Sequence, residues 1–171
     1  MTMFTHRELA GDQPLAGRLL VVTDARLGHA TRQVRGLMYR EMFQEAGWTV
    51  EFHDLRRRLS GFWAPSWGRE NEIVRAAREA DAVYLLKVAS LRLVDRLRRE
   101  TSARIIFDMT DALWRPLHRR LGWRDLERIL ARCDAVFANH SYVSTYAQQY
   151  NPEVHIVSDA APVDKFDALR E

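Results

Sequence analysis

Six short apolar runs recur along the chain, and each of the first five is followed by a stretch with helical spacing. The runs are residues 18–23, 49–53, 82–86, 105–107, 135–138 and 154–157. Most are apolar almost throughout, which is typical of strands buried on both faces of a parallel sheet. The pattern therefore predicts an α/β fold: a doubly wound, mostly parallel, Rossmann-like sheet of about six strands.

The helical stretches have apolar residues at the spacing of one helix face. They cover about residues 31–46, 70–80, 91–97, 115–132 with a break near Gly122, and 143–150 with Ser141 as the N-cap. Right-handed crossovers through these helices are expected between parallel strands. With the strands numbered along the chain, the predicted order is 3-2-1-4-5-6, which separates the third strand from the fourth.

The chain has 171 residues, 47% of them apolar, which suits a single domain with a substantial core. Residues 1–17 are polar with interspersed glycine and proline, and we expect a flexible arm there. The Rossmann-like domain is expected over residues 18–166.

Charge and cysteine content narrow the classes of partner and compartment. The net charge is +3, with basic and acidic residues interleaved, which predicts no nucleic-acid partner. The single Cys133 cannot form an intrachain disulfide, which favours a reducing compartment. No Cys/His cluster has zinc spacing, so no metal site is predicted. No apolar stretch approaches 18 residues, and a soluble, cytoplasmic protein is expected.

Two carboxylates follow the fourth apolar run directly. Asp108 and Asp111 come after residues 105–107, and Trp114 follows them. The carboxyl ends of parallel strands are where open α/β sheets hold their ligands. The pair could orient sugar hydroxyls, act as a general base or hold a metal, and one of the two could merely cap the next turn. The spacing alone does not define a metal site, because no third ligand is evident.

Other strand ends carry weaker signals. Gly28 and His29 lie between the first strand and its helix, where free N–H groups favour anions. One glycine is not a dinucleotide or P-loop motif, so no cofactor is predicted. Lys87 ends the third strand and either pairs with Asp108 or Asp111 or is a surface lysine. His140 follows the fifth strand without the sequence context of a hydrolase triad.

The segment between the second strand and the next helix combines cations with large aromatics. Three arginines at 56–58 precede Phe62, Trp63 and Trp67 among glycine, proline and serine, as in a loop. Arg57, Trp63 and Trp67 would suit an anionic bilayer surface or a lipid-linked acceptor. The alternatives are stacking on a sugar or a partner domain, or a loop folded back into the core.

Five segments together resemble a known family. They are residues 19–55, 80–90, 104–114, 133–147 and 154–166. Their order is similar to the N-terminal, acceptor-side domain of GT-B glycosyltransferases, group 1 or family 4. In a subgroup of that family the third strand ends in a lysine and the fourth in D-x-x-D with a following aromatic, which Lys87 and residues 108–111 match. The chain departs from the family in its first loop, where Gly28 is the only glycine, and at Ala160 and Ala161.

The resemblance implies a retaining enzyme that transfers a sugar from a nucleotide-sugar donor to a cell-envelope glycan or lipid-linked acceptor. Asp108 and Asp111 would position the acceptor. Gly28, His29, Lys87 and His140 would contribute to substrate binding. The donor would be held mainly by a second domain, to which residues 167–171 would begin the link, so this chain alone is expected to be inactive. The cations and aromatics at residues 56–67 add the expectation of peripheral contact at the inner face of the membrane. The alternatives are a non-catalytic Rossmann-like binding module or one subunit of a split two-chain enzyme.

Overall fold

The computed structural model describes residues 17–24, 38–55, 58–59, 62–63, 67–116 and 123–158. Gly28, His29 and Arg57 lie outside the described residues, as do the side chains of Trp63 and Trp67. The expected arm before residue 17 and link after residue 166 also lie outside them, so both domain boundaries stay predictions.

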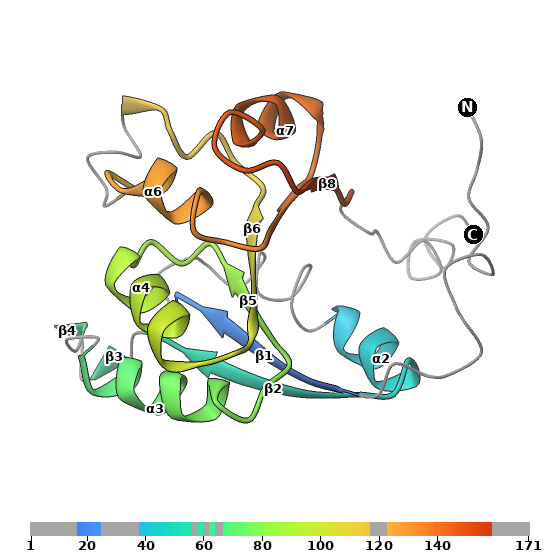
Figure 1. Ribbon diagram of the computed structural model, residues 1–171, viewed down its shortest axis with the longest axis vertical. Helices are drawn as coiled ribbons and strands as arrows, with labels where there is room; N and C mark the ends of the chain where they lie inside the picture. Colours follow the sequence, from blue (N-terminus) through green and yellow to red (C-terminus); the bar gives the residue numbers. More distant parts are fainter. Residues whose placement is uncertain are drawn as a thin grey trace, which may run out of the picture.

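A six-stranded parallel sheet forms the centre of the molecule (Figure 1). Its strands are β1 (Gly17–Thr23), β2 (Trp48–Asp54), β5 (Ala82–Leu86), β6 (Arg104–Met109), β7 (Ala135–Ala138) and β8 (Val154–Ile156). Every neighbouring pair is parallel. The predicted α/β class, with a parallel sheet of about six strands, is confirmed.

The predicted strand order is wrong in its first half. The order is β2-β1-β5-β6-β7-β8, so the third strand of the sheet, β5, lies between β1 and β6 instead of beyond β2. The burial of the strands explains the difference. All five residues of β5 are buried, as in a central strand, whereas β2 is mostly exposed or half-buried, as at an edge.

A small second ladder interrupts the segment that was expected to be loop throughout. β3 (Arg58–Leu59) and β4 (Phe62–Trp63) pair antiparallel, with Arg58 opposite Trp63 and Leu59 opposite Phe62. This two-stranded hairpin connects the edge strand β2 to the helix that leads into β5 (Figure 1).

The described helices are α2 (Met38–Glu45), α3 (Trp67–Ala77), α4 (Leu91–Glu100), α6 (Leu126–Leu130) and α7 (Ser141–Ala147). They fall inside or close to the predicted helical stretches. Ser141 was expected to be the N-cap of α7, but it is the first helical residue and His140 is the cap, without a side-chain bond to the backbone. The described helices include none that is long and apolar enough to cross a bilayer.

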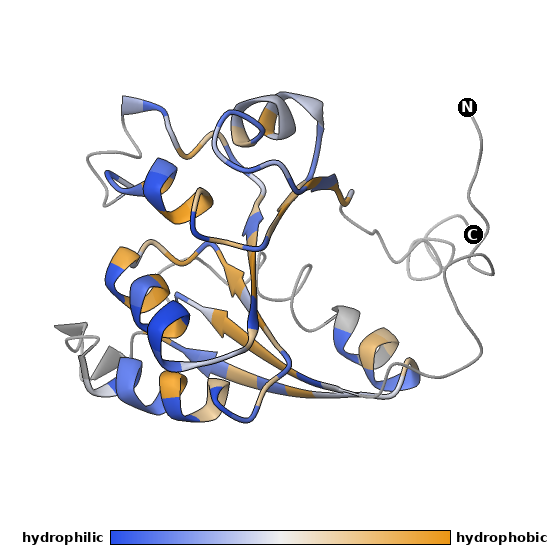
Figure 2. Ribbon diagram, viewed as in Figure 1, coloured by the Kyte–Doolittle hydropathy of each residue, from blue (hydrophilic) through white to orange (hydrophobic). Residues whose placement is uncertain are grey.

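Apolar side chains of alternate strand residues form two cores, one on each face of the sheet. The larger core joins Val83, Leu85, Ile105 and Phe107 to the inner faces of α3, α4, α6 and α7. The smaller core lies on the opposite face, where Phe43 of α2 packs near it. The hydropathy colouring shows the apolar strands and the outward polar faces of α3 and α4 (Figure 2). Helices therefore cover both faces, as a doubly wound fold requires.

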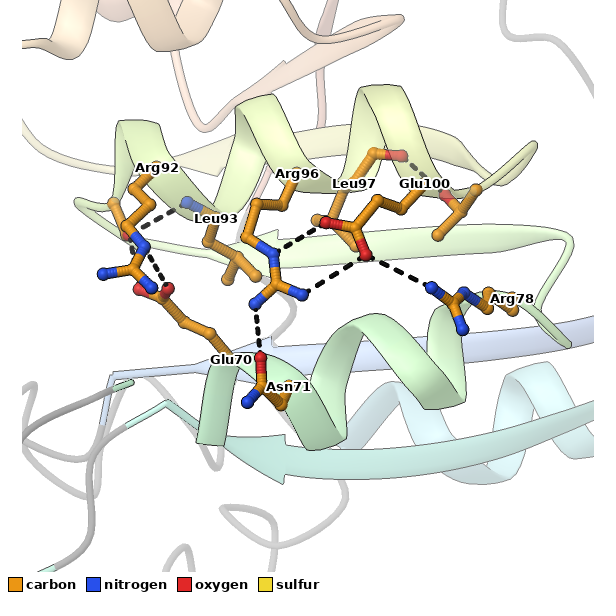
Figure 3. A network of polar contacts seen from close by, with 10 residues as sticks. Glu70, Asn71, Arg78, Arg92, Leu93, Arg96, Leu97 and Glu100 are labelled. Carbon is orange, nitrogen blue, oxygen red and sulfur yellow. Dashed lines mark hydrogen bonds and ion pairs between the residues drawn. The ribbon is translucent and has the colours of Figure 1, made fainter. Parts of the chain in front are cut away.

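A network of polar contacts connects α3 to α4 on the outside of the larger core (Figure 3). Arg96 contacts Glu100 four residues later and donates to Asn71 of α3, while Arg78 contacts Glu100 from the end of α3. The hydrogen bond from Arg96 lowers the pKa of Glu100. These contacts fix α3 and α4 against each other. They lie between the outer faces of two helices, which indicates a structural role.

Two aspartates tie neighbouring strands together at the amino edge of the sheet. Asp81, before β5, accepts a hydrogen bond from Arg18 N through Oδ2 at 2.7 Å. Asp134, before β7, accepts one from Ile105 N at 2.6 Å in the same way. Each aspartate satisfies a backbone N–H at the point where a strand begins, so this edge serves the stability of the sheet.

Candidate functional site at the carboxyl edge of the sheet

All strands of the main sheet run parallel, so the residues that end them meet at one edge. β5 is followed by Lys87, β6 contains Asp108 and is followed by Asp111, and β7 is followed by Asn139 and His140. The register places Leu86 beside Asp108, and Met109 beside Ala138. The structure therefore brings together the ends of the three strands that carry these predicted site residues.

Lys87 is held at this edge by both its backbone and its side chain. Its φ angle is 52°, in the left-handed region that residues with a Cβ rarely adopt. Its N–H donates to the carbonyl of Asp108 at 3.3 Å, and its Nζ lies 2.5 Å from Asp111 Oδ2. Only 6% of Lys87 is exposed, so its interpretation as a surface lysine is wrong and the pairing with Asp111 is confirmed.

Asp111 is the accessible partner of that ion pair. Its side chain is 54% exposed, whereas that of Lys87 is 7% exposed. It lies in the turn after β6, where its carbonyl accepts a hydrogen bond from Leu113 N at 2.7 Å. A carboxylate anchored from behind by a buried cation, with its outer side facing solvent, can accept hydrogen bonds from the hydroxyl groups of a ligand.

Asp108 differs from Asp111 because it lies inside β6 and is fully buried. The strand continues through Met109, two residues further than the predicted apolar run. Tyr84 of β5 donates its hydroxyl to Asp108 Oδ2. In this arrangement Asp108 connects two neighbouring strands, while Asp111 is the carboxylate that solvent reaches. The proposed role of Asp108 in positioning an acceptor stays a prediction.

The ends of β1 and β2 add polar groups that were not among the predicted site residues. Thr23 donates its hydroxyl to Asp54 Oδ1, and its carbonyl accepts from Leu55 N at 2.7 Å. Asp24, directly after β1, is buried. Thr23 and Asp54 are the last residues of β1 and β2, and Asp24 directly follows β1. Asp108 was selected because it directly follows an apolar run. Asp24 and Asp54 also directly follow predicted strands, so the same criterion would have selected them.

Five aromatic side chains gather beside the turn that contains Asp111, and we call them the aromatic cluster: Trp114, His140, Tyr142, Tyr146 and Tyr150. Trp114 stacks on Tyr146 with 4.0 Å between ring centroids and 8° between planes. Tyr142 lies 5.3 Å from Trp114, and His140 lies nearly parallel to Tyr142 at 6.2 Å. Trp114 and His140 stand out separately in the sequence, and the structure shows that they belong to one cluster.

Tyr146 fixes the inner part of the aromatic cluster. Its hydroxyl donates to Glu127 Oε1 at 2.9 Å, between α7 and α6. Burial, together with the hydrogen bond to Glu127, raises the pKa of Tyr146 well above its ordinary value. Tyr146 is therefore a neutral hydrogen-bond donor at any physiological pH, which suits a structural anchor.

Within the described ranges, no group of three or more His, Cys, Asp and Glu side chains is arranged to hold a metal ion. The buried Oδ1 of Asn139, at the end of β7, accepts no hydrogen bond from the described part of the chain. The chemistry that this edge offers comes from an anchored carboxylate, polar strand ends and aromatic rings.

No protein-family model matches the chain, and no curated protein matches it in sequence. Solved structures do match its fold. An alpha-glucosyltransferase in complex with UDP and a DNA containing an HMU base superposes with a TM-score of 0.58 at 13% identity, over 90% of this chain and 45% of that one. The same type of enzyme with UDP-glucose and DNA containing an abasic site gives a TM-score of 0.56 at 13% identity, with the same coverage.

A third match is HepE from Anabaena in complex with UDP and glucose. Its TM-score is 0.52 at 15% identity, over 90% of this chain and 49% of that one. The chain thus spans about half the length of the structures it matches. At these identities the likeness establishes a shared fold, which is the Rossmann-like fold described above.

The prediction that nucleic acid is no partner is wrong. It rested on the small, interleaved net charge, but the matched structures include glucosyltransferases bound to DNA. Charge summed over a chain does not report the local surface on which a nucleic acid is held, so it cannot exclude one.

Proposed function

We propose that this chain forms the acceptor-side half of a GT-B glycosyltransferase that transfers a hexose from a nucleotide-sugar donor to an acceptor hydroxyl. The observation that carries the proposal is the match of 90% of the chain to about half of an alpha-glucosyltransferase bound to UDP. The strand-end chemistry supports it, since an exposed, anchored carboxylate lies at the edge where such sheets bind ligands.

Asp111 has the leading role in this proposal. Its carboxylate would accept a hydrogen bond from the acceptor hydroxyl and so orient the attacking oxygen. Lys87 is a positioning residue, because it holds Asp111 from the buried side. Asp108 keeps the ends of β5 and β6 in register through Tyr84 and through the N–H of Lys87. Gly28, His29 and His140 would face the same cleft.

The donor would be bound by a second unit, which is either a further domain or a separate chain. The coverage of about half of each matched structure supports this division. Transfer needs both substrates in one closed cleft, so the present chain by itself should not turn over. If the second unit is a separate chain, the present chain is one subunit of a split two-chain enzyme.

The remaining parts of the proposal come from the sequence. The resemblance to group 1 or family 4 implies retention of anomeric configuration and a cell-envelope glycan or lipid-linked acceptor. The combination of cations and aromatics at Arg57, Trp63 and Trp67 suggests attachment to the inner face of the membrane. A liposome flotation assay tests the last part. Replacing Trp63 and Trp67 by alanine should abolish flotation with anionic vesicles. Unchanged flotation would contradict membrane attachment through these tryptophans.

The central test is an assay of nucleoside diphosphate release, with the chain supplied together with its donor-binding unit. UDP-, GDP- and ADP-sugars are offered with glycan, lipid-linked and nucleic-acid acceptors. We expect release that depends on the acceptor and falls at least about ten-fold in Asp111→Asn, as expected for loss of a positioning contact. Met42→Ala, an exposed position on α2, is the control that should leave the rate unchanged.

Two results would contradict the proposal. Rapid sugar transfer by the isolated chain would show that no second unit is needed. Absence of release with all donors and acceptors, with the donor-binding unit present and folded, would favour the binding-module alternative.

A further inference from the structure

The aromatic cluster leaves part of its surface open to solvent. Tyr142 is 55% exposed and Tyr150 is 36% exposed. His140, beside Tyr142, is also exposed. The structure gives Tyr142 ring neighbours in His140 and Trp114, so its position is fixed while its outer surface remains accessible.

The rings are held before any ligand arrives. Tyr142 and Tyr146 are four residues apart in α7, which brings them to one side of the helix. Tyr150 follows the end of the helix, and its ring lies 5.3 Å from that of Tyr146. Trp114 stacks against Tyr146, and Tyr146 is tied to α6 by Glu127. A flat surface that is already ordered loses little conformational entropy on binding, which is the condition for a stacking site.

The cluster is close to the anchored carboxylate. Trp114 comes three residues after Asp111, so their Cα atoms are at most about 11 Å apart. Between them the chain turns, with Leu113 N bonded to Asp111 O and Arg115 N to Ala112 O. An aromatic surface and a hydroxyl acceptor thus lie within the span of a small ligand.

We propose that the exposed face of Tyr142, with His140, is a stacking platform for a sugar ring of the acceptor, whose hydroxyls reach Asp111. The proposal rests on the function proposed above and names its acceptor class as a carbohydrate. One face of a pyranose presents C–H groups, which pack on an aromatic ring, while its hydroxyls project from the rim towards polar groups.

The exposed carboxylate at this site favours a ligand that offers hydroxyl groups. The Lys87–Asp111 pair sums to no net charge, and its exposed member is the carboxylate. A sugar hydroxyl next to Asp111 would find a hydrogen-bond acceptor. A nucleobase could also stack on Tyr142, so it is the competing outcome in the test.

The test measures binding by the full chain, without donor. Saturation-transfer NMR is run with a panel of methyl hexosides and disaccharides, and with a short single-stranded oligonucleotide. We expect a saccharide to bind through its C–H face, with affinity about ten-fold weaker in Tyr142→Ala and nearly unchanged in Tyr142→Phe. Met42→Ala, equally exposed but on α2, should bind as the unmodified chain does.

Each other outcome overturns the proposal. If no saccharide binds, the proposed stacking platform is contradicted. It is also contradicted if Tyr142→Ala, with unchanged thermal unfolding, binds a saccharide as well as the unmodified chain does. If the oligonucleotide alone binds and depends on Tyr142, the surface stacks bases and the acceptor class is wrong. Since no donor is present, these results are separate from nucleoside diphosphate release. Release without dependence on Tyr142 would leave the glycosyltransferase standing and remove only the platform.

Discussion

Lys87 and Asp111 form an ion pair across the ends of two neighbouring strands, with 2.5 Å between Nζ and Oδ2. The cation is buried and the anion is exposed. A buried ammonium group is costly unless it is paired, so the position of Asp111 is fixed by the need to satisfy Lys87. An accessible carboxylate with a fixed direction is the result, and the proposed function depends on it.

The left-handed backbone at Lys87 predicts an unusual order of stabilities. Both Lys87→Ala and Lys87→Gly remove the ion pair, but glycine adopts φ of 52° without strain. We expect Lys87→Gly to be more stable than Lys87→Ala by about 1 kcal/mol, measured by urea unfolding. Ala89→Gly, two residues on, is the control and should cost about 0.5–1 kcal/mol. If Lys87→Gly is the less stable of the two, the backbone carries no strain.

The hydroxyl of Tyr84 is predicted to stabilise the buried carboxylate of Asp108. Tyr84→Phe removes a donor from a fully buried acceptor and should cost about 1–3 kcal/mol of unfolding free energy. Tyr142→Phe removes a hydroxyl from an exposed ring and should change stability by less than about 0.5 kcal/mol. Equal effects of the two substitutions would show that the Tyr84 hydroxyl has no special role.

Asn151 is predicted to be among the most sensitive polar residues of the chain. It is buried, its Nδ2 donates to the carbonyls of Leu130 and Cys133 at 2.8 Å each, and its Oδ1 accepts from Glu153 N. Asn151→Ala leaves these backbone groups unpaired and should cost about 2–3 kcal/mol in thermal or urea unfolding.

Asn71→Ala is the matched control for Asn151, because Asn71 is exposed and its Oδ1 accepts a hydrogen bond from Arg96 on the outer surface. Its cost should stay within about 0.5 kcal/mol. A small loss in Asn151→Ala would mean that water replaces the amide there.

Cys133 is predicted to be unreactive in the folded protein. Burial raises the pKa of its thiol to about 12, and its Sγ donates to the carbonyl of Ile129 at 3.2 Å. The thiolate is the reactive form, so Ellman's reagent at mildly alkaline pH should label the chain in urea but not the native chain. Rapid labelling of the native chain would contradict this burial.

The raised pKa of the Cys133 thiol makes the free energy of unfolding depend on pH. The folded pKa lies above the unfolded one, so the contribution of the neutral thiol is complete below about pH 9 and is lost as pH rises towards 12. Urea unfolding across that interval should show a steeper loss for the unmodified chain than for Cys133→Ala. Parallel curves would exclude Cys133 as a source of the alkaline sensitivity.

Element types were largely predictable from the sequence, because they depend on local patterns. β5 and β7 have the predicted bounds, and the other strands of the main sheet differ by one or two residues at an end. A run such as residues 82–86 is apolar on both sides of the chain, and that pattern is typical of a buried parallel strand. The short β3–β4 ladder was missed because two-residue strands carry no periodic pattern.

Strand order was not predictable in the same way. A buried strand can pair on either side, and the choice is made by the crossover that packs α3 and α4 against one face of the sheet. The polar residues Thr49, Glu51 and His53 of β2 were a usable sign of an edge position, but the prediction placed β5 at the edge instead. The error had a consequence for the site, since it separated Lys87 from β6.

The sequence by itself determined that polar groups end apolar strands, and it identified Lys87, Asp108, Asp111 and His140 as residues to examine. The apolar pattern of each strand was sufficient to locate these residues, because the end of a strand is a local feature of the sequence. Only the tertiary structure decided that Lys87 meets Asp111, that Asp108 is buried against Tyr84, and that Trp114 stacks on α7. These contacts join residues from different strands and helices, and packing of the whole sheet fixes them.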